Sequence, residues 1–206
     1  MNSIGLRILA VLSFLLMPCL CACASTDLPF GQVTNGSIAA AGQTDSYTFS
    51  ASANDVVDFT VVTTSGGMNP RLRLYSPTGA LLNDQANRYY GACNGGSVIE
   101  LNTVTLVAGG TYTVLVGDCG DTSTGGYDLY MQRPDNPSGP ISLPFGQVQS
   151  GTIGSAALDN TYTFSASVND VVDFTAVTTS GSMNPSDEFY NGGRIASPGT
   201  LLAGSK

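Results

Sequence analysis

The stretch "SYTFSASANDVVDFTVVTTSG" at residues 46–66 decides the fold class of this chain. Apolar and polar residues alternate in its two halves, which are separated by the turn-forming pair Asn54 and Asp55. Alternation with a period of two is typical of β-strands with one buried face. The residues expected on the buried side are Tyr47, Phe49, Ala51, Val57, Phe59 and Val61.

The same alternation recurs downstream in short runs that are separated by turn residues. Its expected inward residues are Leu72, Leu74, Ile99, Leu101, Tyr112, Val114, Val116, Tyr127, Leu129 and Met131. About eight short strands of this kind predict an all-β fold, an antiparallel two-sheet β-sandwich of the jelly-roll type. The inward phase shifts between Leu101 and Val104, which requires a bulge or a corner between sheets, and we favour the corner.

The chain also contains a duplication. Residues 28–70 align with residues 143–185 at a constant offset of 115, and 30 of the 43 positions are identical. The segment between the copies is rich in Pro, Gly and Asn, as expected of a linker. The predicted organisation is a complete sandwich module at 25–133, a linker at 134–142 and a second module at 143–206.

The second module is predicted to be truncated. Its pattern departs from the first copy after Pro185, and six inserted residues are needed to align Arg194 with Arg73. Nothing in it corresponds to residues 97–132. Missing strands would leave sheet edges open, and we therefore expect the sequence to be a fragment or the product of a truncated reading frame.

Residues 1–24 are predicted to be a signal peptide. Arg7 precedes an apolar run, and Ala22-Cys23-Ala24 fits a small-residue cleavage site that would release Ser25. Two alternatives are a bacterial lipoprotein acylated at Cys23 and a retained membrane anchor. No later segment is apolar enough to span a membrane, so we expect a secreted or cell-surface protein.

Composition excludes several functions. The chain has 7 basic and 15 acidic residues and no histidine, which gives a net charge of −8. Binding to nucleic acid is not expected, because phosphates require clustered Lys and Arg. Catalytic systems and metal sites that depend on imidazole are absent.

Three of the five cysteines fall in the leader, which leaves Cys93 and Cys119. An even pair in an oxidising compartment favours a disulfide, and free or redox-active thiols are the alternative. We expect the pair at the open end of a hairpin, because Cys93 shortly precedes one predicted strand and Cys119 directly follows the next.

Two acids flank Cys119, namely Asp118 and Asp121. They could bind Ca²⁺ together with loop carbonyls, although loop aspartates often serve only to form turns. No other cofactor is indicated. Asp58 and Asp128 fall at outward strand positions, where we expect solvated charges rather than a catalytic pair.

A contact surface is predicted from exposed Tyr and Arg side chains, which are enriched at binding hot spots. The alternative is that the tyrosines stabilise cross-strand pairs. The predicted contact residues are Arg71, Arg73, Tyr75, Tyr89, Tyr90 and Tyr130.

The motifs "DSYTFSASANDVVDFTV", "NPRLRLYSPTGALL", "GGTYTVLVGD" and "GGYDLYMQ" occur in an order that resembles the bacterial pre-peptidase C-terminal domain. The resemblance covers 28–133 fully and 143–206 in part. It implies a non-catalytic jelly-roll sandwich, sometimes in tandem, that is appended to secreted proteases and other exported proteins. One departure is the presence of Asn54 and Asn169 where the family has Gly, and Asn tolerates the left-handed conformation that this turn requires.

The favoured interpretation is a non-catalytic exported module that aids attachment to an extracellular polymer or surface, or assists a neighbouring protease or other catalytic domain. An adhesive or structural cell-surface repeat protein is the second hypothesis. A small secreted hydrolase is the third.

Overall fold

The computed structural model describes residues 25–185, 189–190, 195–196 and 201–202. The predicted leader at 1–24, Cys23 included, and the proposed counterpart of Arg73 at Arg194 lie outside the described residues. Within these residues no helix of the length and apolarity needed to cross a membrane occurs.

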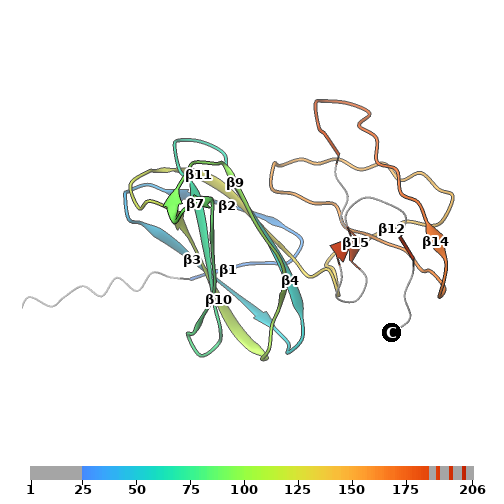
Figure 1. Ribbon diagram of the computed structural model, residues 1–206, viewed down its shortest axis with the longest axis horizontal. Coiled ribbons are helices and arrows are strands. Elements are labelled where there is room, and N and C mark those ends of the chain that lie inside the picture. Colours follow the sequence, from blue (N-terminus) through green and yellow to red (C-terminus); the bar gives the residue numbers. More distant parts are fainter. Residues whose placement is uncertain (1–24, 186–188, 191–194, 197–200, 203–206) are drawn as a thin grey trace, which may run out of the picture.

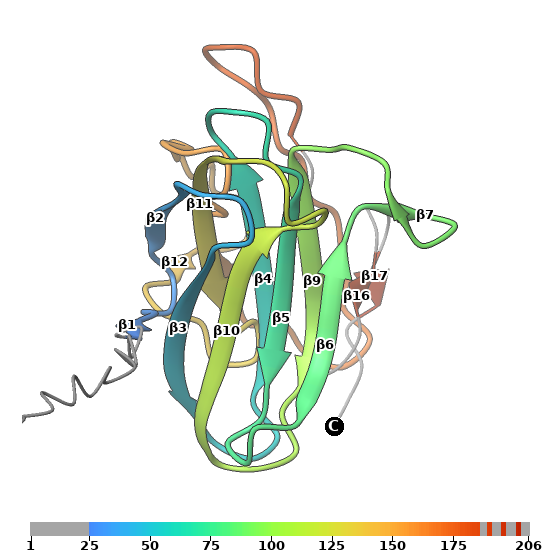
Figure 2. The ribbon, with the colours of Figure 1, turned by 90° about the vertical axis from the view of Figure 1, so that its left-hand side faces the viewer.

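The first module is a sandwich of two sheets (Figures 1 and 2). The five-stranded sheet has the spatial order β1 (Thr26–Asp27), β3 (Thr44–Ala51), β10 (Gly110–Asp118), β5 (Pro70–Tyr75) and β6 (Leu81–Ala86). The four-stranded sheet has the order β2 (Val33–Ile38), β11 (Gly125–Gln132), β4 (Val56–Thr63) and β9 (Val98–Thr105). All neighbours are antiparallel except the parallel pair β1 and β3. The predicted all-β sandwich is confirmed.

Aromatic rings join the two sheets at the centre of the core. Phe49 on β3 stacks on Tyr112 of β10 with ring centroids 5.4 Å apart. The Phe49 ring also meets the edge of Phe59, on β4 of the opposite sheet, at 5.8 Å. Every residue expected on the inward side lies in this core or packs against it, which shows that the period-two pattern identified the buried faces correctly.

The phase shift after Leu101 is a β-bulge. Strand β9 pairs with β4 on both sides of the irregularity, where Val57 lies opposite Val104 and Phe59 opposite Leu101. The extra residue Thr103 has a φ of 55°, and its amide donates a hydrogen bond to the carboxylate of Asp58. The prediction of a corner between sheets was therefore wrong, because a two-against-one bulge restores the phase within one sheet.

A small hairpin links the two sheets between β6 and β9. It consists of β7 (Arg88–Tyr89) and β8 (Ala92–Cys93), and it extends from one end of the sandwich (Figure 2).

Short strand pairs occur in the second copy and at the end of the predicted linker. They are β12 (Ile141–Ser142) with β13 (Tyr162–Thr163), β14 (Val171–Val172) with β17 (Leu201–Leu202), and β15 (Phe189–Tyr190) with β16 (Ile195–Ala196).

Local structure repeats between the copies. The parallel pairing of Ile141 with Tyr162 corresponds, at the offset of 115, to that of Thr26 with Tyr47. The turn residues Asn54 and Asn169 have φ angles of 72° and 71°, so each adopts the left-handed conformation expected from the sequence.

A polar network closes one end of the core. The hydroxyl groups of Tyr47 and Tyr127 lie 2.7 Å apart, and Tyr127 donates a hydrogen bond of 2.7 Å to Asp45. Burial and these hydrogen bonds raise the pKa of Tyr127. Strand β2 can pass over this network only with Gly36, since a Cβ there would lie 2.2 Å from Cζ of Tyr127 and 2.7 Å from the Tyr47 hydroxyl.

We expect Gly36→Ala to destabilise the first module by about 1–3 kcal/mol, because the added methyl group overpacks the tyrosine pair. The free energy of unfolding in denaturant measures the loss. The matched control is Gly67→Ala, where a Cβ meets nothing within 4 Å and φ is not positive. Equal stability of the two variants would contradict the assignment.

Candidate binding surface

Strand β5 places three of the predicted contact residues on one surface. Arg71, Arg73 and Tyr75 alternate with buried Leu72 and Leu74, and so project from the outer face of the five-stranded sheet. Their partners on β10 are Gly117, Leu115 and Thr113, in that order. The sequence-based grouping of these three side chains therefore matches their positions in the fold.

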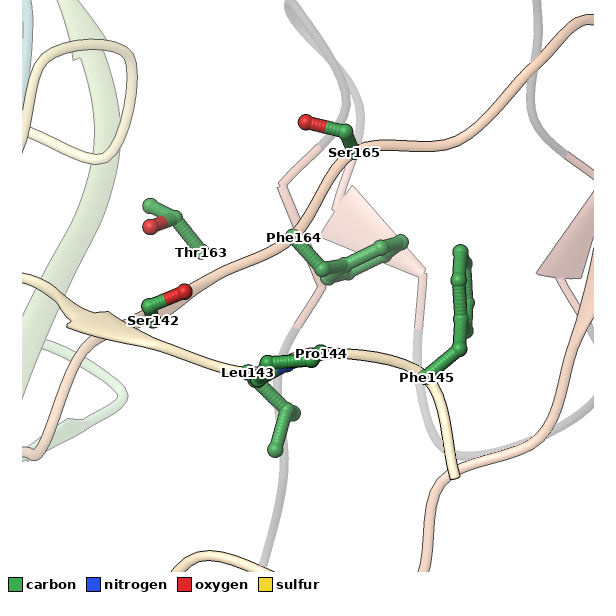
Figure 3. A pocket seen from close by; sticks show the side chains of 7 residues that line it. All are labelled: Ser142, Leu143, Pro144, Phe145, Thr163, Phe164 and Ser165. Carbon is green, nitrogen blue, oxygen red and sulfur yellow. The ribbon is translucent and has the colours of Figure 1, made fainter. Parts of the chain in front are cut away.

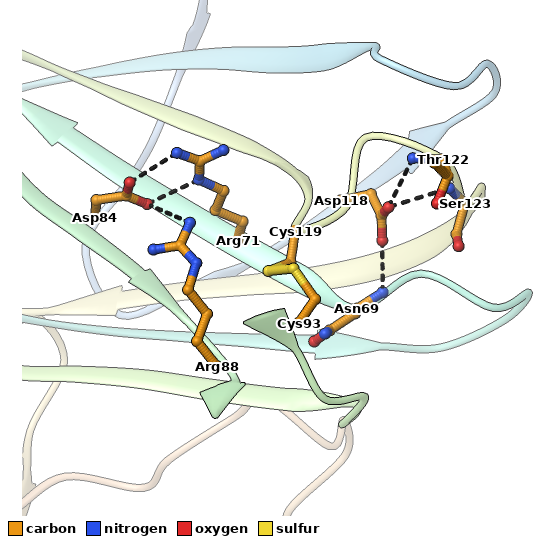
Figure 4. Close-up of a disulfide and its surroundings, with 9 residues drawn as sticks. All are labelled: Asn69, Arg71, Asp84, Arg88, Cys93, Asp118, Cys119, Thr122 and Ser123. Atoms are coloured by element: carbon orange, nitrogen blue, oxygen red, sulfur yellow. Dashed lines mark hydrogen bonds and ion pairs between the residues drawn. A yellow bond between two sulfur atoms is a disulfide. The ribbon is translucent and has the colours of Figure 1, made fainter. Parts of the chain in front are cut away.

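A salt-bridge network organises the guanidinium groups (Figure 4). Nε and Nη2 of Arg71 donate hydrogen bonds of 2.8 and 2.7 Å to the two carboxylate oxygens of Asp84 on β6. Arg88 reaches the same carboxylate at 3.4 Å. The hydrogen bonds from Arg71 are the main cause that lowers the pKa of Asp84. This bidentate geometry holds Arg71 in one orientation, whereas Arg73 makes no ion pair within the described part of the chain.

The β7–β8 hairpin presents Tyr90 at its tip. Tyr90 is 94% exposed, and it and Gly91 have φ angles of 50° and 81°. Two consecutive positive φ angles between paired strands are typical of a type I′ turn. Tyr89 takes part through its backbone pairing with Ala92. The Arg88–Asp84 bridge connects this hairpin to the outer face of β5 and β6.

Cys93 and Cys119 form a disulfide with their Cα atoms 5.9 Å apart, which is the pairing that the cysteine count favoured. Its location differs from the prediction, because β9 and β10 belong to different sheets and do not form a hairpin. The disulfide instead ties the β7–β8 hairpin to the residue that follows β10 (Figure 4).

Asp118 organises the adjoining loop. One of its carboxylate oxygens accepts a hydrogen bond from the backbone N–H of Asn69 at 2.9 Å. The other accepts from the backbone N–H groups of Thr122 and Ser123 at 3.0 and 3.1 Å. Burial alone would raise the pKa of Asp118, but these backbone hydrogen bonds outweigh it and lower the pKa. Asp118 is buried, whereas Asp121 is exposed with a φ of 56°.

Asp118 and Asp121, the two acids considered for a calcium site, have different surroundings in the structure. Three backbone N–H groups donate to the two carboxylate oxygens of Asp118 and stabilise its charge without a cation. No group of three or more His, Cys, Asp or Glu side chains suited to a metal occurs among residues 25–185 and the other described positions. Asp118 therefore serves as the hydrogen-bond acceptor that holds the backbone of the adjoining loop.

Two outward residues of β11 are covered, contrary to expectation. Tyr130 is only 3% exposed and Asp128 only 8% exposed, although both project from the outer face of the four-stranded sheet. Residues of the second copy, among them Ala157, pack over this face. Tyr130 is therefore separated from the other predicted contact residues, and Asp128 is not a solvated charge.

A shallow pocket of about 410 Å³ lies in the second copy (Figure 3). Its walls include Phe145 and Phe164, which correspond to Phe30 and Phe49 in the first copy. In the first copy Phe49 stacks on Tyr112, whereas Phe164 packs against Phe189 at 5.7 Å. The pocket is lined by hydroxyl and apolar side chains without a charged group.

Sequence reasoning did not identify Asp84 as the shared partner of Arg71 and Arg88. The only sequence signal was the spacing of four residues between Asp84 and Arg88. This spacing indicates an ion pair on a helix, but Asp84 lies on an edge strand and Arg88 on a hairpin. Only the pairing of β5 with β6 brings Arg71 and Asp84 together.

The fold defines the first module as an antiparallel β-sandwich. The family model of the bacterial pre-peptidase C-terminal domain matches residues 43–118. The first module therefore contains a domain of this family, and the match does not extend to the second copy.

Among solved structures, the pre-peptidase C-terminal domain of collagenase from Bacillus anthracis is similar to this chain, with 21% sequence identity and a TM-score of 0.40. The similarity covers 52% of this chain and 94% of that domain. None of the curated proteins matches the chain.

We expect the double substitution Cys93→Ser and Cys119→Ser to lower the free energy of unfolding by about 3 kcal/mol, since the disulfide closes a long loop in the unfolded chain. Denaturant titration of the oxidised protein measures the loss. Reductant should destabilise the wild-type chain similarly and leave the double variant unchanged. A reductant effect of equal size in both proteins would show that the disulfide is not its cause.

We expect Asp118→Asn to cost about 2 kcal/mol near neutral pH, because charge-assisted hydrogen bonds to three amides are lost. The folded-state pKa of Asp118 lies below its unfolded value of about 3.9, so its contribution is present above about pH 4 and is lost as pH falls through the folded pKa. The stability difference between variant and wild type should therefore shrink below about pH 4.

Asp121→Asn is the matched control for this experiment. Asp121 is exposed and Asn accepts its left-handed backbone, so we expect a change within about 0.5 kcal/mol. A loss at Asp121 as large as that at Asp118 would contradict the loop role assigned to Asp118.

Proposed function

We propose that this chain is an exported, non-catalytic binding protein whose first module attaches to an extracellular polymer through the outer face of the five-stranded sheet. The observation that carries the proposal is the grouping of Arg71, Arg73 and Tyr75 on that face. The opposite outer face is occupied by the second copy, as the burial of Tyr130 shows.

The chemistry of this face suits an extended ligand with many oxygen acceptors. Arg71, Arg73 and Arg88 surround one carboxylate, Asp84, and form a local concentration of positive charge on a chain with a net charge of −8. Thr113 lies beside Tyr75 and adds a hydroxyl group. Carbonyl or carboxylate groups of a polymer would find N–H and O–H donors along two neighbouring strands.

The use of its carboxylates supports a non-catalytic role. Asp118 accepts backbone amides, Asp84 accepts arginine, and Asp45 accepts the Tyr127 hydroxyl. Each of these acids thus serves as a structural acceptor. A glycosidase requires two carboxyl groups that converge on the substrate, whereas these three acids are already engaged by donors of the protein itself.

Export is supported by the disulfide, since disulfides persist in oxidising compartments. Pre-peptidase C-terminal domains occur in secreted bacterial proteins, and the proposed leader at 1–24, cleaved before Ser25 or acylated at Cys23, would direct export. In this proposal the polymer is a substrate for a neighbouring protease domain. The second candidate function, a cell-surface repeat protein, is favoured by the local structural equivalence of the two copies.

We expect the exported chain to co-sediment with at least one of three insoluble polymers: gelatin beads, chitin and peptidoglycan. Arg73→Ala and Tyr75→Ala should each weaken that binding by about tenfold or more, as is usual for hot-spot residues. Glu100→Ala, on β9 of the other sheet, is the control and should bind like wild type. Double-stranded DNA should not bind, because the chain is acidic.

Two results would contradict the proposal. Unchanged binding in both β5 variants would exclude this face, and loss confined to Tyr90→Ala would place the contact on the hairpin tip. Turnover of a peptide or glycan substrate by the purified chain would overturn the non-catalytic role.

A further inference from the structure

The outer face of the four-stranded sheet is buried by a turn of the second copy. Val62 on β4 and Tyr130 on β11 are 6% and 3% exposed, and Ala157 packs against them at 1% exposure. Val33 and Leu158 are partly buried at the margin of this cluster. We call residues 155–161 the docking turn. The outer surface formed by Val33, Val62, Asp128, Tyr130 and Gln132 is called the docking face.

Hydrogen bonds surround this apolar contact. The Tyr130 hydroxyl donates to the carbonyl oxygen of Asp159 at 3.0 Å. The carboxylate of Asp128 accepts a hydrogen bond from the Ser155 hydroxyl and another from the side-chain amide of Asn35. The buried carboxylate of the docking face is therefore satisfied partly by the docking turn, as a buried charge requires.

The linker is also held against the first module. Oε1 of Gln132 accepts the Ser138 amide at 3.0 Å, and its Nε2 donates to the Ser138 carbonyl oxygen at 3.1 Å. The same nitrogen lies 3.5 Å from the Thr161 hydroxyl of the docking turn. Gln132 thus contacts both the linker and the docking turn.

The two copies differ mainly in this region. Of the 13 positions that differ between residues 28–70 and 143–185, ten fall between 34 and 46 in the first copy. These ten positions correspond to 149–161 in the second copy, a segment that contains the whole docking turn. Outside this segment the aligned residues differ at only three positions, 53, 61 and 67 of the first copy.

The changes convert a self-contained turn into one that contacts a neighbour. In the first copy, Oε1 of Gln43 accepts the Ala39 and Ala40 amides and its Nε2 donates to Ser37 and Asp45. Leu158 replaces Gln43 in the second copy and packs on the docking face instead.

Two further replacements act in the same direction. Ala157 replaces Gly42, whose φ of 75° suits glycine, so the turn adopts another backbone conformation. Ser155 replaces Ala40 and supplies the hydroxyl that Asp128 accepts.

We propose that residues 155–161 are a docking element specific to the second copy, and that the outer face of the four-stranded sheet is its receptor, so that the two copies form one fixed unit. The interaction is directional, because the corresponding turn of the first copy lacks the serine hydroxyl, the alanine methyl group and the leucine side chain that make the contact. It leaves the outer face of the five-stranded sheet open.

The test is a triple reversion to the first copy's residues, Ser155→Ala, Ala157→Gly and Leu158→Gln, in the exported chain. Undocking should expose the linker, so we expect a nonspecific protease to cleave within 134–142 at a rate about tenfold higher than in wild type. All three changes lie outside the first module, so its melting transition should persist. The matched control reverts Val168→Ala and Ser182→Gly, two exposed positions outside the turn, and should be cleaved like wild type.

A double-mutant cycle tests the contact from the receptor side. Val62→Thr nearly preserves the volume of an outward side chain, and its effect on linker cleavage should be non-additive with that of Leu158→Gln because the two residues belong to one cluster. Additive effects, or an unchanged cleavage rate in the triple reversion, would overturn the proposal. A wild-type chain that is dimeric by light scattering, and that becomes monomeric on triple reversion, would also overturn it, since the turn would then dock on a second copy of the chain.

Discussion

The contact of Phe49 with Tyr112 in its own sheet and with Phe59 in the opposite sheet is the interaction on which the rest of the structure depends. It joins the two sheets at their centre and determines which side of every strand is buried. Because side chains alternate along a strand, burying Phe49 and Phe59 forces their neighbours outward. The two outer faces, and everything that they can bind, follow from that packing.

The outer faces have become chemically different. One carries Arg71, Arg73 and Tyr75 and remains open, while the other carries Val62 and Tyr130 and is covered by the second copy. A ligand on the open face would not compete with the second copy. Tandem modules of this kind can therefore combine a fixed internal contact with an accessible binding face.

The second copy shows how a duplicated module can diverge and still keep part of its aromatic packing, although each of its described strands spans only two residues. Phe145, Phe164 and Phe174 reproduce the edge contacts of Phe30, Phe49 and Phe59. The place of Tyr112 beside the central ring is taken by Phe189. Substitution is concentrated instead in the turn that meets the first module, where a change alters a contact between modules rather than the core.

The sequence by itself determined the buried side of each strand, the left-handed turns at Asn54 and Asn169, and the pairing of Cys93 with Cys119. These features depend on neighbours along the chain or on a count. Only the tertiary structure decided that Thr103 forms a bulge within one sheet, that Arg71 pairs with Asp84, and that Tyr130 is covered. Each of these outcomes depends on strand order and on contacts between distant segments, and a period-two pattern shows which side of a strand is apolar but not what will cover it.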